Sequence, residues 1–186
     1  NIIKQKESCK SVALFFTSKE EERKKIMRMT TYNMEYNNDR TPTLVKEKTK
    51  NYPEYDKLNT PHILTKFMSA EMHADRLSEE HCWMIAISTA CKPLGLFEIS
   101  HGGSSESIID SKAVATRLLL CGATGFLLCH NHPSGDLSPS QSDREVTQKL
   151  VELAKVMDLG FTDHIIIGMD DDGHTNFFSF RESGLI

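Results

Sequence analysis

The sequence contains no apolar run that approaches the roughly 20 residues a membrane-spanning helix needs. It also contains no internal repeat and no low-complexity tract. Hydrophobic residues make up 39% of the 186 positions and charged residues 26%, which are ordinary values for a soluble protein. A chain of this length suits one domain plus an extension. We therefore expect a globular protein that does not enter a membrane.

Cysteine is scarce and irregularly placed. The five cysteines are an odd number and include no Cys-x-x-Cys pair, which argues against a disulfide framework and against a cysteine-rich zinc site. Cys82, Cys121 and Cys129 stand among apolar residues and are interpreted as small buried hydrophobic side chains. A reducing cytoplasm is the expected location. Because the chain begins at Asn1 rather than Met, we expect a fragment or a processed chain, and an upstream domain or a removed signal peptide stays open.

Two common zinc-enzyme signatures are absent. The chain has no HExxH, which argues against a zincin, and no HxE followed by PCxxC, which argues against a nucleobase deaminase. The letters HNH at residues 130–132 also name a nuclease class. That class spreads its three residues along a longer motif, so the adjacency is a coincidence of spelling.

Charge is distributed unevenly along the chain. Residues 1–60 carry 13 Lys and Arg against 9 Asp and Glu, whereas residues 61–186 carry a net charge of −8. An acidic second part is a poor non-specific binder of nucleic acid. The basic run at residues 23–25 directly follows three glutamates, which indicates a solvated amphipathic helix rather than a DNA-binding patch. Charge therefore argues against DNA as a partner.

The stretch from Phe126 to Asp143 carries the strongest signal for chemistry. The apolar residues 126–129 predict a buried strand, and His130 and His132 follow it one residue apart. Alternate residues on a strand point to the same side, so both imidazoles can face one point. After a turn, Ser138 as N-cap, Pro139 and Gln141 predict the start of a helix.

That helix predicts an inward carboxylate. Asp143 falls in its second turn, with Ser140 three residues earlier on the same face and the apolar Val146 three residues later. A carboxylate buried without a partner is costly. Two histidines and an aspartate that converge on one point are three ligands of a zinc site, and a fourth position left to water makes such a site catalytic.

These residues resemble a known family. His130-x-His132, seven residues, Ser140, two residues and Asp143 match the pattern of the JAMM (MPN-plus) zinc metallopeptidases. The variant HNHPSGD at residues 130–136, with DHIIIG at 163–168, resembles the RadC branch of that superfamily. The similarity covers roughly residues 60–186 and, more weakly, 40–59. It implies one Zn²⁺ per chain and a cytidine-deaminase-like sheet flanked by helices.

The resemblance also implies the catalytic residues. A zinc hydrolase needs a group that moves the proton from the attacking water to the leaving amine. JAMM enzymes carry a glutamate where the first domain helix meets the next strand, and Glu80 occupies that junction here, with Glu79 as the alternative after a one-residue slip. We expect Ser140 to donate a hydrogen bond to the developing oxyanion. The alternative for Ser140 is a first-turn serine that competes for the helix cap.

Two further polar residues near the motif have open roles. His164 follows Asp163 at a strand start, where a structural hydrogen-bonding pair is expected and a fourth metal ligand is the alternative. Asp136 is interpreted as a turn residue, with a position behind the metal ligands as its alternative.

The remaining pattern predicts an α/β fold, a mixed β-sheet flanked by helices in an α/β/α sandwich. Residues 1–59 are expected to form a partly ordered N-terminal extension and residues 60–186 the RadC-like JAMM/MPN domain. The predicted elements are strands at 11–16, 43–45, 82–89, 94–100, 163–168 and 176–180, helices at 20–29 and 61–77 and a third that begins at Asp110 or Ser111 and ends by Gly122, and a loop at 30–39.

Three functions remain at this stage. The first is a zinc metallopeptidase or isopeptidase that acts on an unknown protein or peptide. The second is a DNA-repair-associated protein, a role that comes only with the RadC label. The third is a zinc-binding MPN scaffold without turnover. For residues 1–59 two uses stay open, which are docking of a partner protein and pairing with a second copy as a homodimer.

Overall fold

The protein is described here by a computed structural model that covers residues 26–102 and 109–186. The strand predicted at 11–16 and the first part of the helix predicted at 20–29 lie outside these residues. The strands are β1 (Met27–Tyr36), β2 (Pro42–Tyr52), β3 (His81–Ile87), β4 (Pro93–His101), β5 (Gly125–Asn131), β6 (Gly160–Met169) and β7 (Thr175–Ser179). The helices of the described residues are α2 (Pro61–Met72), α3 (Ser111–Leu120) and α4 (Gln141–Val156).

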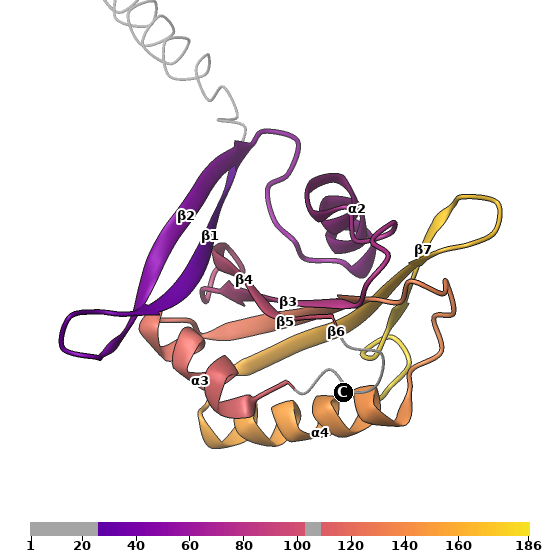
Figure 1. Cartoon of the computed structure of the whole chain (residues 1–186). Coiled ribbons are helices and arrows are strands. Elements are labelled where there is room, and N and C mark those ends of the chain that lie inside the picture. The colour runs from indigo at the N-terminus through magenta and orange to yellow at the C-terminus, as the bar shows by residue number, and fades with distance from the viewer. Residues whose placement is uncertain (1–25, 103–108) are drawn as a thin grey trace, which may run out of the picture.

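The strands form one seven-stranded sheet in the order β2-β1-β4-β3-β5-β6-β7. The pairs β1/β4 and β5/β6 are parallel, and the other neighbouring pairs are antiparallel. Helix α2 covers one face of the sheet, and α3 and α4 cover the other (Figure 1). This arrangement confirms the predicted mixed sheet flanked by helices.

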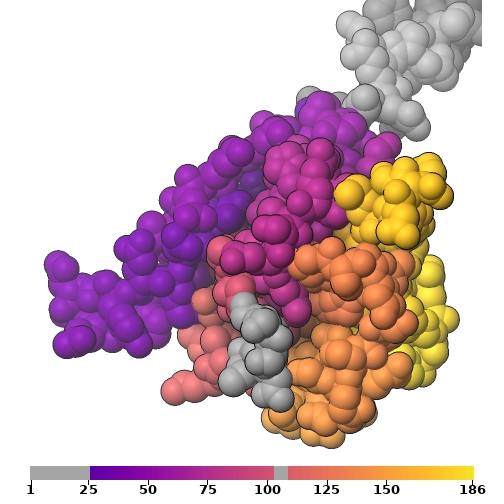
Figure 2. Space-filling view, turned by 45° about the vertical axis from the view of Figure 1, so that its right-hand side comes forward, coloured from indigo at the N-terminus to yellow at the C-terminus, as the bar shows by residue number. Residues whose placement is uncertain are grey.

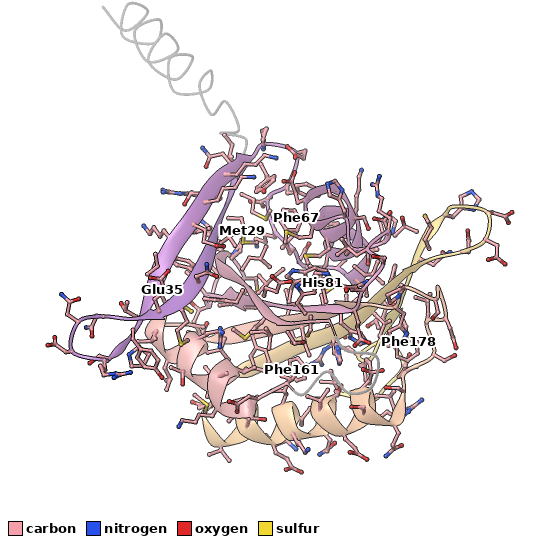
Figure 3. All side chains as sticks on the ribbon, viewed as in Figure 1. Met29, Glu35, Phe67, His81, Phe161 and Phe178 are labelled. Carbon is pink, nitrogen blue, oxygen red and sulfur yellow. The ribbon has the colours of Figure 1, made fainter. Side chains whose placement is uncertain are left out.

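Alternation along the central strands produces two cores, one on each face. On β3, Trp83 and Ile85 pack with α2, whereas Cys82 and Met84 pack with α3 and α4. In Figure 3 the labelled Phe67 lies above the sheet and Phe161 below it. Because the central strands are buried on both sides, they read as nearly continuous apolar runs in the sequence.

The prediction of a loop at residues 30–39 is wrong. Those residues belong largely to β1, which pairs with β2 over its whole length, while Thr31 also pairs in parallel with Leu96. Of the asparagines that suggested a loop, Asn37 lies at the hairpin turn, where its Oδ1 accepts hydrogen bonds from the backbone N–H groups of Asp39 and Thr41. Asn33 lies within β1 and donates to Glu47 Oε1. Strand pairing outweighs the local preference for a loop, and β1 is anchored in the core by its first residues, of which Met27 and Met29 are buried.

The hairpin β1–β2 projects from the body of the molecule (Figure 2). The predicted edge strand at 43–45 is confirmed and is longer than expected, since β2 spans Pro42–Tyr52 at the end of the sheet. Residues 27–29, predicted as helix, are strand. The division of the chain near residue 59 stays a prediction, although the hairpin before it shares the sheet of the following residues.

Helix starts agree better with the sequence than helix ends do. Thr60 caps α2 by accepting a hydrogen bond from the Ile63 N–H, and Asp110, rather than Ser111, caps α3. Helix α2 ends at Met72 instead of continuing to residue 77, because His73 adopts a left-handed conformation (φ 56°) that turns the buried Ala74 towards the core.

The described residues contain no helix that combines the length and the apolar character needed to cross a membrane. Cys82 and Cys129 are each 1% exposed, and Cys121 is half-buried. The prediction of buried cysteines therefore holds fully for two of the three.

The start of β6 is held by a buried carboxylate. Asp163, 4% exposed, accepts hydrogen bonds from the backbone N–H groups of His164 and Arg181 and from the Ser179 hydroxyl. We expect Asp163→Ala to lower the free energy of unfolding by about 2–4 kcal/mol, because three donors lose their acceptor. Chemical denaturation would measure this loss. The exposed Asp171→Ala is the control, with an expected change within about 0.5 kcal/mol; equal losses in both variants would contradict this role for Asp163.

Candidate metal centre

The structure brings His130, His132 and Asp143 together at one end of β5. The two Nε2 atoms lie 3.0 Å apart. Asp143 Oδ1 is 3.2 Å from His130 Nε2, and Asp143 Oδ2 is 3.6 Å from His132 Nε2. Ligands with bonds of 2.0–2.1 Å to a tetrahedral ion stand about 3.3 Å from one another. These three separations scatter around that value.

The two histidines face the same side because the strand pattern continues past the end of β5. His130 is 2% exposed and lies on the sheet face of Phe126 and Leu128, towards α4. The His132 backbone N–H donates to the Ile167 carbonyl at 2.8 Å, which extends the pairing with β6 by one residue. His132 Nδ1 meets the Asp136 carbonyl at 2.5 Å. Because a carbonyl only accepts, His132 carries its hydrogen on Nδ1.

The helix start differs from the prediction by two residues. Ser140, not Ser138, is the N-cap of α4, and Asp143 therefore lies in the first turn rather than the second. Ser140 Oγ accepts from the Asp143 N–H at 3.1 Å, and Asp143 Oδ2 accepts from the Ser140 N–H at 2.8 Å. This reciprocal capping box satisfies two backbone donors at once, an arrangement that Ser138 with Gln141 did not achieve. It also orients the carboxylate towards the histidines.

Ser140 has a third contact with Asp143. Its hydroxyl lies 2.6 Å from Asp143 Oδ2 and donates to it. These contacts are those of a capping serine, which was the alternative interpretation of Ser140. The oxyanion role stays a prediction, since it requires the hydroxyl hydrogen to turn away from Asp143.

A chain of hydrogen bonds determines which nitrogen of His130 is free. Thr147 donates its hydroxyl hydrogen to the Asp143 carbonyl (2.6 Å), so it accepts from His164 Nδ1 (2.6 Å). His164 then offers the lone pair of Nε2 to His130 Nδ1, at 2.8 Å. His130 thus carries its hydrogen on Nδ1, and its Nε2 presents a lone pair to Asp143 and His132.

Burial supports this assignment by keeping the inner histidines neutral. Removal from water lowers the pKa of His130 to about 4, with the charge of Asp143 opposing the shift. Burial likewise lowers the pKa of His164 well below its usual value. A neutral imidazole with one hydrogen bonded behind it is the form that binds a metal.

Asp143 and His132 each shift the pKa of the other. Burial raises the pKa of Asp143, but the nearby His132 and His130 and the hydrogen bonds from Ser140 outweigh this effect and hold the pKa below its usual value. Burial lowers the pKa of His132, but the approach of the Asp143 carboxylate, the hydrogen bond to the Asp136 carbonyl and the charges of Asp143 and Glu80 raise it overall. A carboxylate therefore faces two imidazoles whose hydrogens lie on their far sides. Such a set of lone pairs needs a cation, which is either a proton on His132 or a metal ion.

The two candidate glutamates differ in burial and in the residues that surround them. Glu80 is half-buried, and its pKa is raised chiefly by burial, with the charge of Asp143 adding to the shift and His132 opposing it. Glu79 is exposed, and its Oε2 lies 2.8 Å from His101 Nε2. The charge of Glu80 therefore acts on His132 and Asp143, whereas the Glu79 carboxylate contacts His101.

Asn131 holds Glu80 in this place. It lies between the two histidines in sequence but is 1% exposed and points towards the segment before β3. Its Oδ1 accepts from the His81 N–H at 2.8 Å, and its Nδ2 donates to the Glu79 carbonyl at 3.0 Å. The side-chain amide of Asn131 thus hydrogen-bonds to the backbone of both neighbours of Glu80 and ties them to β5, the strand that contains His130.

Asn131 and Thr147 had no role predicted from the sequence. A polar residue inside the strand was the available signal for Asn131, and a threonine four residues after Asp143 for Thr147. His164 is a hydrogen-bonding residue, as expected, but its ring pairs with His130 and Thr147, while Asp163 accepts only from its backbone. Asp136 is a turn residue through its side chain and supports His132 through its carbonyl.

Comparison with known proteins agrees with this arrangement. The RadC-like JAB domain family matches residues 58–185. A UPF0758 protein of Flavobacterium johnsoniae is 36% identical over 109 residues, 59% of this chain and 45% of that protein. A UPF0758 protein of Clostridium acetobutylicum is 32% identical over 140 residues, 74% of this chain and 59% of that protein. The chain thus spans about half the length of the curated relatives it matches. It belongs to the RadC-like JAB domain family.

Proposed function

We propose that this protein is a zinc-dependent metallohydrolase that cleaves a peptide or isopeptide bond. The observation that carries the proposal is the convergence of three lone-pair atoms, from His130, His132 and Asp143, at separations of 3.0–3.6 Å. A separate half-buried carboxylate, Glu80, supports it, because its charge acts on His132 and Asp143. Membership of the RadC-like JAB domain family supports the same class of chemistry.

The ligand types favour zinc among the common ions. Two imidazoles and one carboxylate are the ligand set of catalytic zinc sites, whereas magnesium and calcium prefer oxygen ligands alone. A bound zinc ion would act as a Lewis acid and lower the pKa of its water towards about 7.

The protein residues would divide the remaining work. Glu80 accepts the proton of the attacking water and delivers it to the leaving amine, a task for which a carboxyl group with a raised pKa is suited. Ser140 donates its hydroxyl hydrogen to the developing oxyanion after releasing Asp143. Asn131 keeps Glu80 in register, and the chain from Thr147 through His164 holds the lone pair of His130 on its inner side.

A surface groove beside the centre supports a polymeric substrate. It has a volume of about 640 Å³ and is lined by the turn from Gly135 to Pro139, by Arg144 and by the β6–β7 hairpin residues Asp170, Asn176, Phe177 and Phe178. The Asp136 carbonyl in this turn is the acceptor for His132, so the groove borders the ligands. We infer that a peptide segment of a protein substrate would lie in this groove. The expected location of the reaction is a reducing cytoplasm.

Metal analysis tests the first part of the proposal. After dialysis against zinc-free buffer the protein is expected to retain one zinc per chain, because His130, His132 and Asp143 supply a pre-arranged ligand set. His132→Ala and Asp143→Ala are each expected to lose it, as measured by elemental analysis. The exposed His174→Ala is the matched control and should retain the metal. Retention of the same zinc by both ligand variants would contradict this site.

Glu80→Gln separates metal binding from turnover. The amide cannot accept a proton, so we expect the variant to retain its zinc while cleavage of a peptide library falls by at least about 100-fold. The exposed Glu35→Gln, in the β1–β2 hairpin, is the control and should cleave at the parent rate. Equal rates in the parent and in Glu80→Gln would refute the proton-carrier role. Bound zinc without cleavage in the parent protein would leave the scaffold function in its place.

Thr147→Val tests the hydrogen-bond chain behind His130. Valine keeps the shape but removes the acceptor for His164 Nδ1, so zinc affinity is expected to fall by about 10–100-fold in competition with a chelator. Thr147→Ser keeps the hydroxyl and should restore the affinity. If serine and valine weaken binding equally, packing rather than the hydrogen bond is responsible.

A further inference from the structure

We propose a second metal site, formed by Glu79, His81 and His101 at the open end of the β3–β4 pair. One ring nitrogen of each histidine and one carboxylate oxygen of Glu79 lie within 4.8 Å of one another. None of these side chains belongs to the candidate centre described above. The proposed ligand is a divalent ion that prefers imidazole, with zinc as the probe.

Strand pairing brings the two histidines together. His81, the first residue of β3, is the register partner of His101, the last residue of β4. Their ring centroids are 3.9 Å apart, with planes 21° from parallel. Directly opposed residues of an antiparallel pair point to the same face, so the backbone itself sets this spacing. His81 lies near the centre of Figure 3.

Glu79 completes the set from the segment before β3. Its Oε2 lies 2.8 Å from His101 Nε2. The Gly102 N–H donates to the Glu80 carbonyl at 2.9 Å, which ties the end of β4 to this segment. Asn131 holds the same segment from the other side through the Glu79 carbonyl and the His81 N–H. The backbone that carries all three ligands is therefore held before any ion binds.

A second carboxylate orients His81. Glu98 Oε1 lies 2.6 Å from His81 Nδ1, and a carboxylate only accepts, so His81 carries its hydrogen on Nδ1 and keeps a lone pair on Nε2. The Trp83 ring stacks on His81 at 5.4 Å with planes 7° apart, which restricts rotation of the imidazole. A histidine backed by a carboxylate in this way is the usual form of a metal ligand.

The chemistry of the set favours zinc-like ions and leaves coordination positions open. Two imidazoles with one carboxylate form a His₂Glu set, which suits zinc better than magnesium or calcium. The side chains of Glu79 and His101 are 62% and 52% exposed, so solvent or a ligand reaches the ion. The exposed side chains also lose more conformational freedom on binding, and we therefore expect weaker binding than at His130, His132 and Asp143.

Occupancy of this site would act on Glu80. Glu80 lies between Glu79 and His81 in the sequence, and its backbone carbonyl accepts a hydrogen bond from the Gly102 N–H. An ion that joins Glu79 and His81 to His101 would fix both neighbours of that carboxylate. The site would thus be a clip that stiffens the segment next to the candidate centre, and its existence does not depend on the proposed hydrolase activity.

Zinc titration of the tag-free, dialysed protein tests the proposal. By isothermal titration calorimetry with elemental analysis, the dialysed protein is expected to take up a second, weaker equivalent of zinc. His101→Ala and Glu79→Gln should each abolish this second equivalent and retain the first. Glu98→Gln should weaken the second equivalent by about 10–100-fold, because it loses the carboxylate behind His81. The exposed His62→Ala is the control and should bind both equivalents.

Two outcomes would overturn the second site. The first is that the parent takes up no second equivalent. The second is that His101→Ala and Glu79→Gln, with unchanged circular dichroism, bind two equivalents as the parent does. His132→Ala distinguishes the two sites, because it should lose only the tightly held zinc and still bind the weaker equivalent. Loss of both equivalents in His132→Ala would also count against an independent site.

Discussion

The approach of the Asp143 carboxylate to two imidazole lone pairs is the constraint on which the rest of this structure depends. Three hydrogen-bond acceptors at 3.0–3.6 Å repel one another unless a cation lies among them. The protein supports this costly arrangement from behind. The Asp136 carbonyl accepts a hydrogen bond from His132, and His164 accepts one from His130. The backbone N–H of Ser140 donates to the carboxylate as part of the helix cap. The capping box is thus part of both the helix and the site.

The sheet provides the positions for these groups. The parallel pair β5/β6 places His130 beside Ile166 and Leu128 beside His164, so both histidines lie under α4 on the same face. Helix α4 packs on that face through Leu150 and Ala154, which sets its first turn above His130. Across β5, the antiparallel strand β3 brings the segment of Glu80 to the same end of the sheet. The candidate centre therefore depends on the pairing of the neighbouring strands β3, β5 and β6 and on the packing of α4 against them.

Histidine and carboxylate pairs recur beyond that centre. Glu79 with His101 and Glu98 with His81 form a second, more exposed group at the neighbouring end of β3 and β4. Asn131 connects the two groups, because one amide bonds to the backbone on both sides of Glu80. The short sequence from Glu79 to His81 thus faces two ways, with Glu80 towards the inner ligands and its neighbours towards the outer ones.

The sequence by itself predicted what local spacing can determine. Alternation on a strand placed His130 and His132 on one side, and Thr60 with Pro61 marked a helix start. The central strands were predicted from their apolar runs, and the mixed α/β fold followed from the order of elements. A proline near a serine was insufficient to locate the start of α4, because Ser138 and Ser140 both satisfy the local pattern. Only the reciprocal bonds of Ser140 with Asp143 distinguish them.

Only the tertiary structure decided the contacts between residues distant in sequence. Strand β1 exists because β2 and β4 pair with it, although its asparagines favour a loop. The surroundings of Glu79 and Glu80 differ because strand pairing and Asn131 fix their segment, so that the charge of Glu80 acts on His132 and Asp143 while Glu79 contacts His101. The free nitrogen of His130 depends on His164, 34 residues away, and on Thr147 in α4. Hydrogen bonds of this kind leave no periodic trace in a sequence, because each partner is polar alone and gains its role only when the fold brings the other within reach.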